Sequence, residues 1–272
     1  MSALRNQMEC RPLGLPVYVL QRTLNTKRMA KLERVFVWTG GVLFVTSLAV
    51  CLYSYLFVWG RAVFHATSLE ARDSAVIDGD QIIPLVAIAA DALLLTLFAA
   101  HHSVFARDRI KAAVARAIPE RLLRSFYVWV ASTLLILVCA FWVPVGGDLY
   151  RATGWRALPF GATQLYGLWI IVQAVRGIDP LELAGIRREA ARGPLQITGP
   201  YALVRHPLYF GWVLAVFATP HMTGDRLAFA AITTLYLVIA IPWEERSLVR
   251  SFGEDYARYA REVRWRMIPF IY

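Results

Sequence analysis

The sequence predicts an all-α integral membrane protein with about six transmembrane helices. Hydrophobic residues make up 58% of the 272 residues, and the mean hydropathy is +0.48. Soluble domains contain about 45–50% apolar residues. The apolar residues form blocks of roughly 16–25 residues separated by short charged segments, a length typical of membrane-spanning helices. Both the composition and its distribution therefore favour a lipid environment.

Six apolar blocks are the expected helices, at about 35–59, 82–100, 126–145, 157–176, 207–220 and 227–243. The hydrocarbon offers the backbone no hydrogen-bonding partner, so each block should be helical. The fifth block is short, because residues 208–220 would span only about 20 Å of a hydrocarbon core of about 30 Å. The fifth and sixth blocks are therefore expected to form a short hairpin that is tilted or partly inserted.

Lysine and arginine alternate between the connections. The segments before the first block and after the second, fourth and sixth blocks hold 24 of these residues, and the other three connections hold 5. Basic residues collect on the cytoplasmic side of membrane proteins. We therefore expect both termini to be cytoplasmic, in the inner membrane of a bacterium. The alternation also accounts for the net charge of +10, so the expected partner is the lipid bilayer and not nucleic acid.

Cysteine usage gives no sign of a metal centre. Cys10, Cys51 and Cys139 are isolated, and no CxxC pair is present. Neither a disulfide framework nor a zinc site is expected. Cys51 and Cys139 lie in apolar blocks, where buried thiols are the ordinary expectation.

The main candidate site lies in segment 193–211 and at the end of the sixth block. Gly and Pro residues break this segment into turns, and Arg205-His206 stands directly before the fifth block. The short hairpin should return Glu244-Glu245 to the same membrane surface. Carboxylates, an arginine and turn amides around one cytoplasmic pocket would suit a zwitterion. The alternative is a helix-end charge cluster in which the two Glu side chains pair with nearby Arg.

A second candidate is Asp91, near the middle of the second block. An ionisable group at that depth is costly and is usually functional or paired. His102 follows eleven residues later, close to three helical turns, so both side chains should project from one face about 16 Å apart. They could line a cavity that rises from the cytoplasm. Alternatively, Asp91 bonds to a neighbouring helix and His102 is an interfacial histidine.

The run from Gly199 to Gly211, with Glu244-Glu245-Arg246 and the spacing of Tyr256 and Tyr259 after it, resembles a known family. It is similar to the membrane methyltransferases related to isoprenylcysteine carboxyl methyltransferase and phospholipid N-methyltransferase. The resemblance covers about residues 193–269. It implies that S-adenosylmethionine is the cofactor and that the matching positions bind it: Gly199, Pro200, Tyr201, Arg205, His206, Pro207, Tyr209, Gly211, Glu244 and Glu245.

The front half carries a second, weaker resemblance. Asp91–Leu95, His101–Arg107 and Arg124–Tyr127 are similar to methanethiol S-methyltransferase and to NnrU-like membrane proteins. The stretch Ala218–Thr223 also resembles the S-methyltransferase branch. Asp179–Gly185 departs from the aromatic-rich run expected there, so the lip of the acceptor pocket should differ.

The resemblances together imply methyl transfer from S-adenosylmethionine to a small or lipophilic thiol, with no metal. His206, Arg205 and Glu245 are the catalytic candidates on the cofactor side, and Asp91 and His102 on the acceptor side. The implied division is a basic N-terminal arm (1–33), helices 1–4 with the acceptor region (34–192) and the methyltransferase core (193–272).

Other activities stay open. A prenylcysteine carboxylate or a phospholipid amine could be the acceptor instead of a thiol. Some NnrU-like proteins bind haem, and in a haem-binding isomerase or redox protein His102 and His206 could ligate the iron. A transporter with Asp91 as its proton site is a third possibility, although the paired broken helices typical of transporters are absent from the sequence pattern.

Overall fold

The protein is a helical bundle with one small β-ribbon. The computed structural model describes residues 17–61, 79–105, 108–176, 178–187 and 193–272. Cys10 and the part of the predicted N-terminal arm before Val17 lie outside these residues. The rest of the predicted arm, residues 17–33, is part of the first helix, which begins at Val17.

Among the described residues, five helices are long and apolar enough to cross a membrane. They are α1 (Val17–Tyr53, continued by a π-helical turn, Ser54–Val58), α2 (Gly79–Phe105), α4 (Leu123–Ala140), α5 (Ala157–Val175) and α8 (Gly224–Phe252). The four shorter α-helices among the described residues are α3 (Asp108–Val114), α6 (Pro180–Leu183), α7 (Pro207–Phe217) and α9 (Glu254–Glu262). Short 3₁₀ turns cover Glu120–Leu122, Gly154–Arg156 and Gly199–Ala202. An integral membrane protein is thus confirmed.

The fifth predicted block is short, as expected, but the sixth is longer than the predicted hairpin allows. The fifth is α7, whose eleven residues span about 16 Å, so five helices of the described residues, and not six, are long enough to cross a membrane. The sixth is α8, whose 29 residues extend for about 43 Å. Glu244-Glu245 were expected to end this helix, but they lie inside it. The helix continues because no breaker follows until Gly253, whose φ is +55°.

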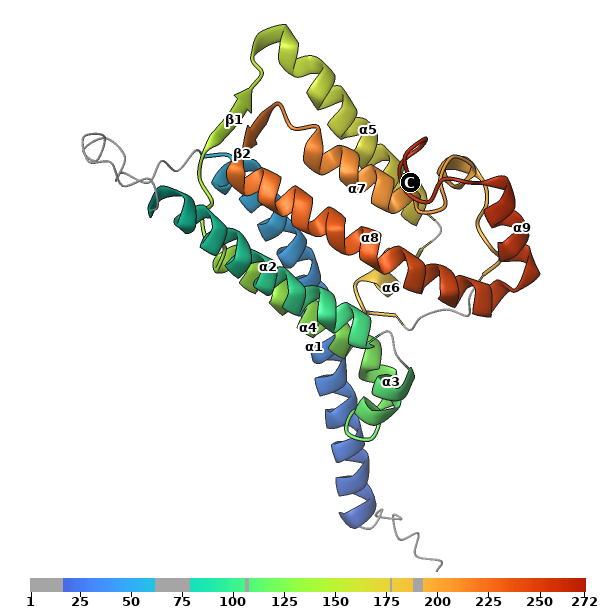
Figure 1. Ribbon diagram of the computed structural model, residues 1–272. Coiled ribbons are helices and arrows are strands. Elements are labelled where there is room, and N and C mark those ends of the chain that lie inside the picture. The colour runs from blue at the N-terminus through green and yellow to red at the C-terminus, as the bar shows by residue number, and fades with distance from the viewer. Residues whose placement is uncertain (1–16, 62–78, 106–107, 177, 188–192) are drawn as a thin grey trace, which may run out of the picture.

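The helix α8 runs between two groups of helices (Figure 1). On one side α4 packs against α1 and α2, and on the other α5 packs against α7. The α5–α7 contact is close because it is formed by glycines: a Cβ on Gly167 would lie 2.6 Å from the carbonyl oxygen of Gly211. Small residues permit such backbone approach between membrane helices.

Buried polar residues fill the N-terminal end of α8. Arg226 donates to three carbonyl oxygens, those of Tyr55 (2.9 Å), Leu56 (2.8 Å) and His221 (2.5 Å). The two backbone carbonyls from α1 belong to its π-helical turn. We call this group, with Asp225 and its partners, the Arg226 cluster.

Asp225 joins α8 to the loop that follows α4. Its Oδ1 accepts hydrogen bonds from the Trp142 indole (2.8 Å) and from the Val145 amide (2.9 Å). Nearby, β1 (Asp148–Arg151) pairs antiparallel with β2 (His221–Thr223), which leads directly into α8. The ribbon and the buried charges therefore fasten this end of the bundle.

Candidate functional site

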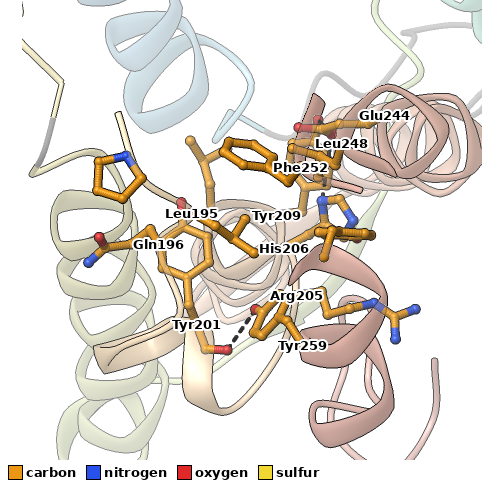
Figure 2. Close-up of a pocket in the computed structure, with 13 residues that line it drawn as sticks. Leu195, Gln196, Tyr201, Arg205, His206, Tyr209, Glu244, Leu248, Phe252 and Tyr259 are labelled. Carbon is orange, nitrogen blue, oxygen red and sulfur yellow. Dashed lines mark hydrogen bonds and ion pairs between the residues drawn. The ribbon is translucent and has the colours of Figure 1, made fainter. Parts of the chain in front are cut away.

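A cavity of about 320 Å³ lies beside the C-terminal half of α8. Residues from the loop after α6, the 199–202 turn, α7, α8 and α9 surround it (Figure 2). They are Pro194, Leu195, Gln196, Tyr201, Arg205, His206, Leu208, Tyr209, Glu244, Leu248, Phe252, Tyr256 and Tyr259. Its volume is at the lower end of the roughly 300–1,000 Å³ usual for small-molecule sites. Aliphatic and aromatic walls with a few polar groups are also typical of such sites.

The local sequence holds Arg205 and His206 between two short helices. Gly199 has a φ of +64°, which an L side chain rarely adopts, and Pro200 starts the 3₁₀ turn. Pro207 occupies the first position of α7, where a missing N–H costs nothing. The Arg205 and His206 amides donate to the carbonyls of residues 265 and 266 at 2.9 and 2.8 Å. The tail after α9 therefore fixes the backbone of this dipeptide.

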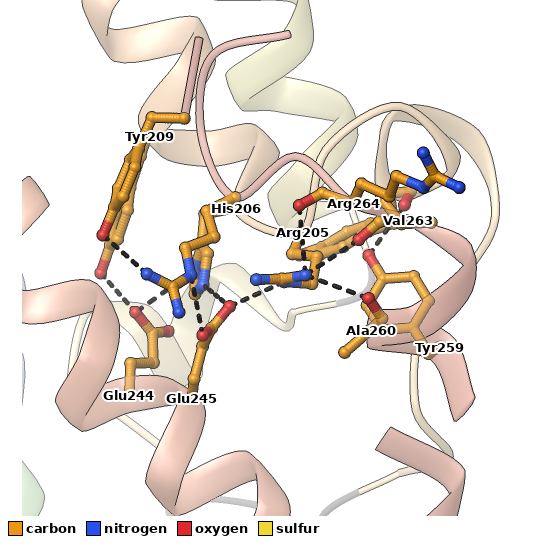
Figure 3. A network of polar contacts seen from close by, with 12 residues as sticks. Arg205, His206, Tyr209, Glu244, Glu245, Tyr259, Ala260, Val263 and Arg264 are labelled. Carbon is orange, nitrogen blue, oxygen red and sulfur yellow. Dashed lines mark hydrogen bonds and ion pairs between the residues drawn. The ribbon is translucent and has the colours of Figure 1, made fainter. Parts of the chain in front are cut away.

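Arg205 is a structural cation at the cavity wall, with its side chain only 9% exposed. Its Nε donates to Glu245 Oε1 at 2.7 Å. Its Nη1 donates to the carbonyls of Ala260 (3.2 Å) and Val263 (3.0 Å) beside α9 (Figure 3). Through these bonds, the Arg205 guanidinium joins α8 to α9 and to the tail.

Glu245 lies behind the cavity wall among cationic side chains. Besides Arg205, it forms an ion pair with Arg266 Nε at 3.2 Å. The ring Nε2 of His206 lies 3.6 Å from Glu245 Oε1. Two guanidinium groups therefore neutralise this carboxylate, and its position fixes one side of the imidazole.

Glu244 faces the cavity, and its side chain is 45% exposed. The Tyr209 hydroxyl donates to Glu244 Oε2 at 2.7 Å, and His206 Nδ1 lies 3.6 Å from the same oxygen. The Tyr209 and His206 rings stack at 5.4 Å. Because no arginine pairs with Glu244 among the described residues, its negative charge is available to a cationic ligand.

Two buried polar atoms at the cavity, His206 Nε2 and the Tyr256 hydroxyl, have no hydrogen bond of ordinary length among the described residues, although both lie near Glu245, with Nε2 3.6 Å from its Oε1. Burial, with the nearby charge of Glu245, raises the pKa of the Tyr256 hydroxyl above its ordinary value. This hydroxyl therefore stays protonated and can donate a hydrogen bond. Buried polar groups in proteins are nearly always paired, so unpaired ones at a cavity indicate a ligand position.

The neighbouring tyrosines are already paired. Tyr259 donates to the Tyr201 carbonyl at 2.8 Å, and the Tyr201 hydroxyl donates to the Ala174 carbonyl in α5 at 3.2 Å. Burial raises the pKa of both hydroxyls. They stabilise the wall of the cavity, and their hydroxyl protons point to protein carbonyls.

The predicted cofactor residues separate into three groups. Tyr201, Arg205, His206, Tyr209 and Glu244 line the cavity, and Glu245 supports them from behind. Gly199, Pro200 and Pro207 shape the backbone and do not line it. Gly211 lies in the α5–α7 contact, where a Cβ would approach the Gly167 carbonyl oxygen to 2.5 Å.

Asp91 lies apart from the cavity-lining residues. It is fully buried, and its Oδ1 accepts a hydrogen bond from the Val143 amide at 2.8 Å, near the N-terminal end of α8. Its other oxygen has no partner among the described residues. Val143 lies close to Val145, whose amide bonds to Asp225 at the start of α8. Glu244 is about twenty residues further along α8, close to 30 Å away. Asp91 and the cavity therefore lie at opposite ends of the bundle.

His102 lies near the C-terminal end of α2 and does not line the cavity. Its Nδ1 is 3.1 Å from the Phe98 carbonyl, and its ring contacts Phe98 and Tyr127. A carbonyl can only accept, so Nδ1 carries the proton and Nε2 keeps a free lone pair. Asp91 and His102 therefore have different surroundings and do not line one shared cavity among the described residues.

Sequence reasoning did not assign a role to Tyr256 or Arg266. Tyr256 was part of the tail pattern, but its unpaired hydroxyl is visible only after α9 has packed against Arg205 and Glu245. Arg266 carries no spacing signal, because the tail folds back to bring it to Glu245. Within the described part of the chain, no group of three or more His, Cys, Asp or Glu residues could hold a metal ion.

Comparison with known proteins shows clear relatives. The chain is 36% identical over 250 residues to the methanethiol S-methyltransferase of Crocosphaera subtropica, covering 88% of this chain and 94% of that protein. It is 34% identical to the methanethiol S-methyltransferase of Pseudomonas sp. (strain GM41(2012)), covering 85% and 92% of the two chains. Human Nurim is more distant, at 30% identity over 60% of this chain and 69% of Nurim. No family model and no solved structure matches the chain.

Proposed function

Because the chain belongs to the methanethiol S-methyltransferase family, we propose that it methylates a small thiol, with S-adenosylmethionine as the donor bound in the cavity beside α8. The observation that carries this proposal is the polar constellation of that cavity. It combines an exposed carboxylate, Glu244, with two buried and unpaired groups, His206 Nε2 and the Tyr256 hydroxyl.

The residues present fit a donor that is both cationic and zwitterionic. Glu244 would hold the ammonium or sulfonium charge, because a carboxylate without an arginine partner attracts a cation. The Tyr256 hydroxyl would donate to the carboxylate. The apolar wall formed by Leu195, Leu248 and Phe252 would cover the adenosine. When bound, the donor supplies an activated methyl group.

The protein's part in the reaction is positioning, exclusion of water and removal of one proton. The acceptor sulfur gains the methyl group, the donor loses its positive charge, and the thiol proton must leave. His206 is our candidate base, because it lines the cavity, stacks on Tyr209, and has each ring nitrogen 3.6 Å from a carboxylate that can stabilise the imidazolium formed when it takes the thiol proton. A thiolate is the reactive form. Burial favours the step, since a thiolate and a sulfonium neutralise each other.

Arg205 and Glu245 act as orienting groups in this proposal. Their mutual bond and the Arg266 pair fix the His206 ring from behind. On the acceptor side we keep His102 as a candidate, because its bond to the Phe98 carbonyl uses Nδ1 and leaves Nε2 for a substrate. For Asp91 we propose a structural role instead, because it bonds to the Val143 amide at the opposite end of α8 from the cavity.

We infer that the cavity opens to the cytoplasm of a bacterium, at the inner membrane. Of the 29 lysine and arginine residues, 24 fall in the four segments predicted to share one side of the membrane, which include Arg205 and the tail, and basic residues collect on the cytoplasmic side. In this orientation the core 193–272 binds the donor and the region 34–192 contributes the acceptor side, with the basic arm 1–33 also cytoplasmic.

Isothermal titration of the purified protein with S-adenosylmethionine and S-adenosylhomocysteine tests the donor. We expect both to bind wild-type protein, and we expect Glu244→Gln to bind about tenfold more weakly. Glu254→Gln is the matched control, since Glu254 is an exposed α9 carboxylate paired with Arg261. The donor assignment fails if neither compound binds wild type, or if Glu244→Gln binds as well as the control.

The acceptor is tested with labelled donor and a panel of methanethiol, larger thiols, a prenylcysteine and a phospholipid amine. Methylation of methanethiol with little turnover of the others is the expected result. Preferred methylation of the prenylcysteine or the amine would replace the thiol assignment. A Soret band in the visible spectrum of the purified protein would favour the haem alternative.

A further inference from the structure

The tail after α9 ends in a compact turn. The amides of Met267 and Ile268 both donate to the Tyr272 carbonyl, at 2.8 and 3.0 Å, and the Tyr272 amide donates back to Ile268 at 3.0 Å. Phe270 has a φ of +66°, the one positive value at a non-glycine residue in the described chain. Side chains rarely adopt this conformation, so the turn holds Phe270 in a specific direction.

That direction is outward from the protein. Phe270 is 84% exposed and Ile271 is 76% exposed. The Phe270 ring contacts only one other ring in the described structure, that of Trp265, with centroids 5.4 Å apart. We call Trp265, Phe270 and Ile271 the tail tip. Two adjacent large apolar side chains so exposed to water would be unfavourable, which indicates another environment.

The position of the tail tip indicates the bilayer. The carbonyls of Trp265 and Arg266 accept from the amides of Arg205 and His206, and Pro207 then begins the apolar helix α7. The tail tip is therefore tied to the level at which α7 starts. Figure 1 shows the C-terminus beside the ends of α5 and α7.

The composition of the tail tip also fits a lipid interface. An exposed arginine, Arg264, precedes Trp265, and Arg266 follows it. Tryptophan at the headgroup level, with basic residues beside apolar ones, is typical of segments that lie in the membrane interface. The helix α5 also exposes large apolar side chains, among them Leu165 and Val172.

We propose that the tail tip inserts into the bilayer leaflet at which α7 begins. This contact goes beyond the proposed methyl transfer and does not depend on it. It has a consequence for the cavity, because the tail segment that carries the tip also bonds to the Arg205-His206 backbone. The same segment pairs with Glu245 through Arg266. Lipid would then cover the tip and hold one wall of the cavity in place.

Nitroxide accessibility measures the insertion directly. In full-length protein with Cys10, Cys51 and Cys139 replaced by Ser, Phe270→Cys is labelled and reconstituted in liposomes of phosphatidylethanolamine and phosphatidylglycerol. Leu165→Cys, 68% exposed on α5, is the lipid control, and Arg258→Cys, 63% exposed on α9, is the aqueous control. Power saturation then compares collisions with oxygen, which concentrates in lipid, and with a water-soluble nickel chelate.

We expect the label at 270 to favour oxygen, as at 165, and the label at 258 to favour nickel. Preference for nickel at 270 would overturn the proposal. Low access to both reagents at 270 would also overturn it, because it would place the tail tip against protein, for example a second copy of the chain.

A second measurement tests the consequence for the cavity. Phe270→Ser/Ile271→Ser and the control Leu165→Ser/Leu168→Ser are titrated with S-adenosylhomocysteine in lipid nanodiscs. We expect about fivefold weaker binding for the tip variant and no change for the control. Equal binding by both would overturn the link between tip and cavity. Absence of binding by wild type would count against the proposed donor, while the nitroxide result would still decide the insertion.

Discussion

Two buried polar clusters occupy opposite ends of α8, and they use the same residue types differently. In the Arg226 cluster, the guanidinium donates to three backbone carbonyls and Asp225 accepts from backbone and indole N–H groups. At the other end, Arg205 and Glu245 bond to each other and to the α9 region, but His206 Nε2 and the Tyr256 hydroxyl beside them stay unpaired.

The difference shows how a buried charge can be assigned to structure or to binding. A polar group whose hydrogen bonds all go to the protein stabilises the fold, because leaving it unpaired would be costly. A group that is buried, unpaired and next to a cavity keeps its bonding capacity for a ligand. By this criterion we assign the Arg226 cluster to the structure and propose the Glu244 end of α8 as the binding site.

The largest expected effect is on the Arg226 cluster. Arg226→Met should lower the free energy of unfolding by about 3 kcal/mol, because it leaves three backbone carbonyls, one buried and two partly buried, without donors. The midpoint of thermal unfolding in detergent should fall by about 5–10 °C. Donor affinity per folded molecule should not change. Arg151→Met, at an exposed arginine of β1, is the control and should leave both quantities unchanged.

Glu245→Gln should lower donor affinity more than stability, the reverse of Arg226→Met. It leaves Arg205 and Arg266 without a balancing charge and frees the His206 ring. We expect donor affinity to fall about 50-fold by titration, with a smaller loss of thermal stability than in Arg226→Met. If Glu245→Gln lost stability and kept its affinity, the two ends of α8 would not differ as described.

A smaller effect separates two neighbouring tyrosines. Tyr256→Phe removes an unpaired hydroxyl, so donor affinity should fall about tenfold while thermal stability is kept or slightly raised. Tyr259→Phe removes a hydroxyl that donates to the Tyr201 carbonyl, so stability should fall by about 1 kcal/mol. Titration and thermal unfolding on both variants check the contrast. Equal affinity in Tyr256→Phe and wild type would show that this hydroxyl does not contact the donor.

The smallest effect is expected at Asp91. Its bond to the Val143 amide resembles the bonds within the Arg226 cluster, and an asparagine oxygen can accept the same bond. Asp91→Asn should therefore change the initial rate of thiol methylation by less than about twofold. A loss of activity of a hundredfold or more, with an unchanged melting temperature, would restore Asp91 to the acceptor side of the reaction.

Much of the membrane architecture could be predicted because hydropathy reports on burial in lipid. The block at 157–176 corresponds to α5 within one residue, and the first three blocks lie within longer helices or overlap them. Hydropathy does not report where a helix ends. Glu244-Glu245 marked the end of the apolar run, but helix α8 continues to Phe252 because its backbone hydrogen bonds do not depend on lipid.

The candidate site could be predicted in part for a similar reason. Breakers around Arg205-His206 and the glutamate pair are local features of the sequence, and the structure brings them together at the cavity. Gly211 was predicted to bind the cofactor but lies in a helix contact. A glycine in the sequence does not by itself show whether it serves helix packing or ligand binding. Arg266 reaches Glu245 only through folding of the tail, which no local pattern records.

The pairing of residues 205–206 with residues 265–266 has a consequence for biogenesis. About sixty residues of chain separate the two segments, so the helices through α7 can enter the membrane before the second segment has been synthesised. Domains form in order as the chain leaves the ribosome. The cavity would then be completed only after α8 has inserted and the tail has returned to the surface, so a chain interrupted within α8 would be embedded in the membrane and unable to bind the donor.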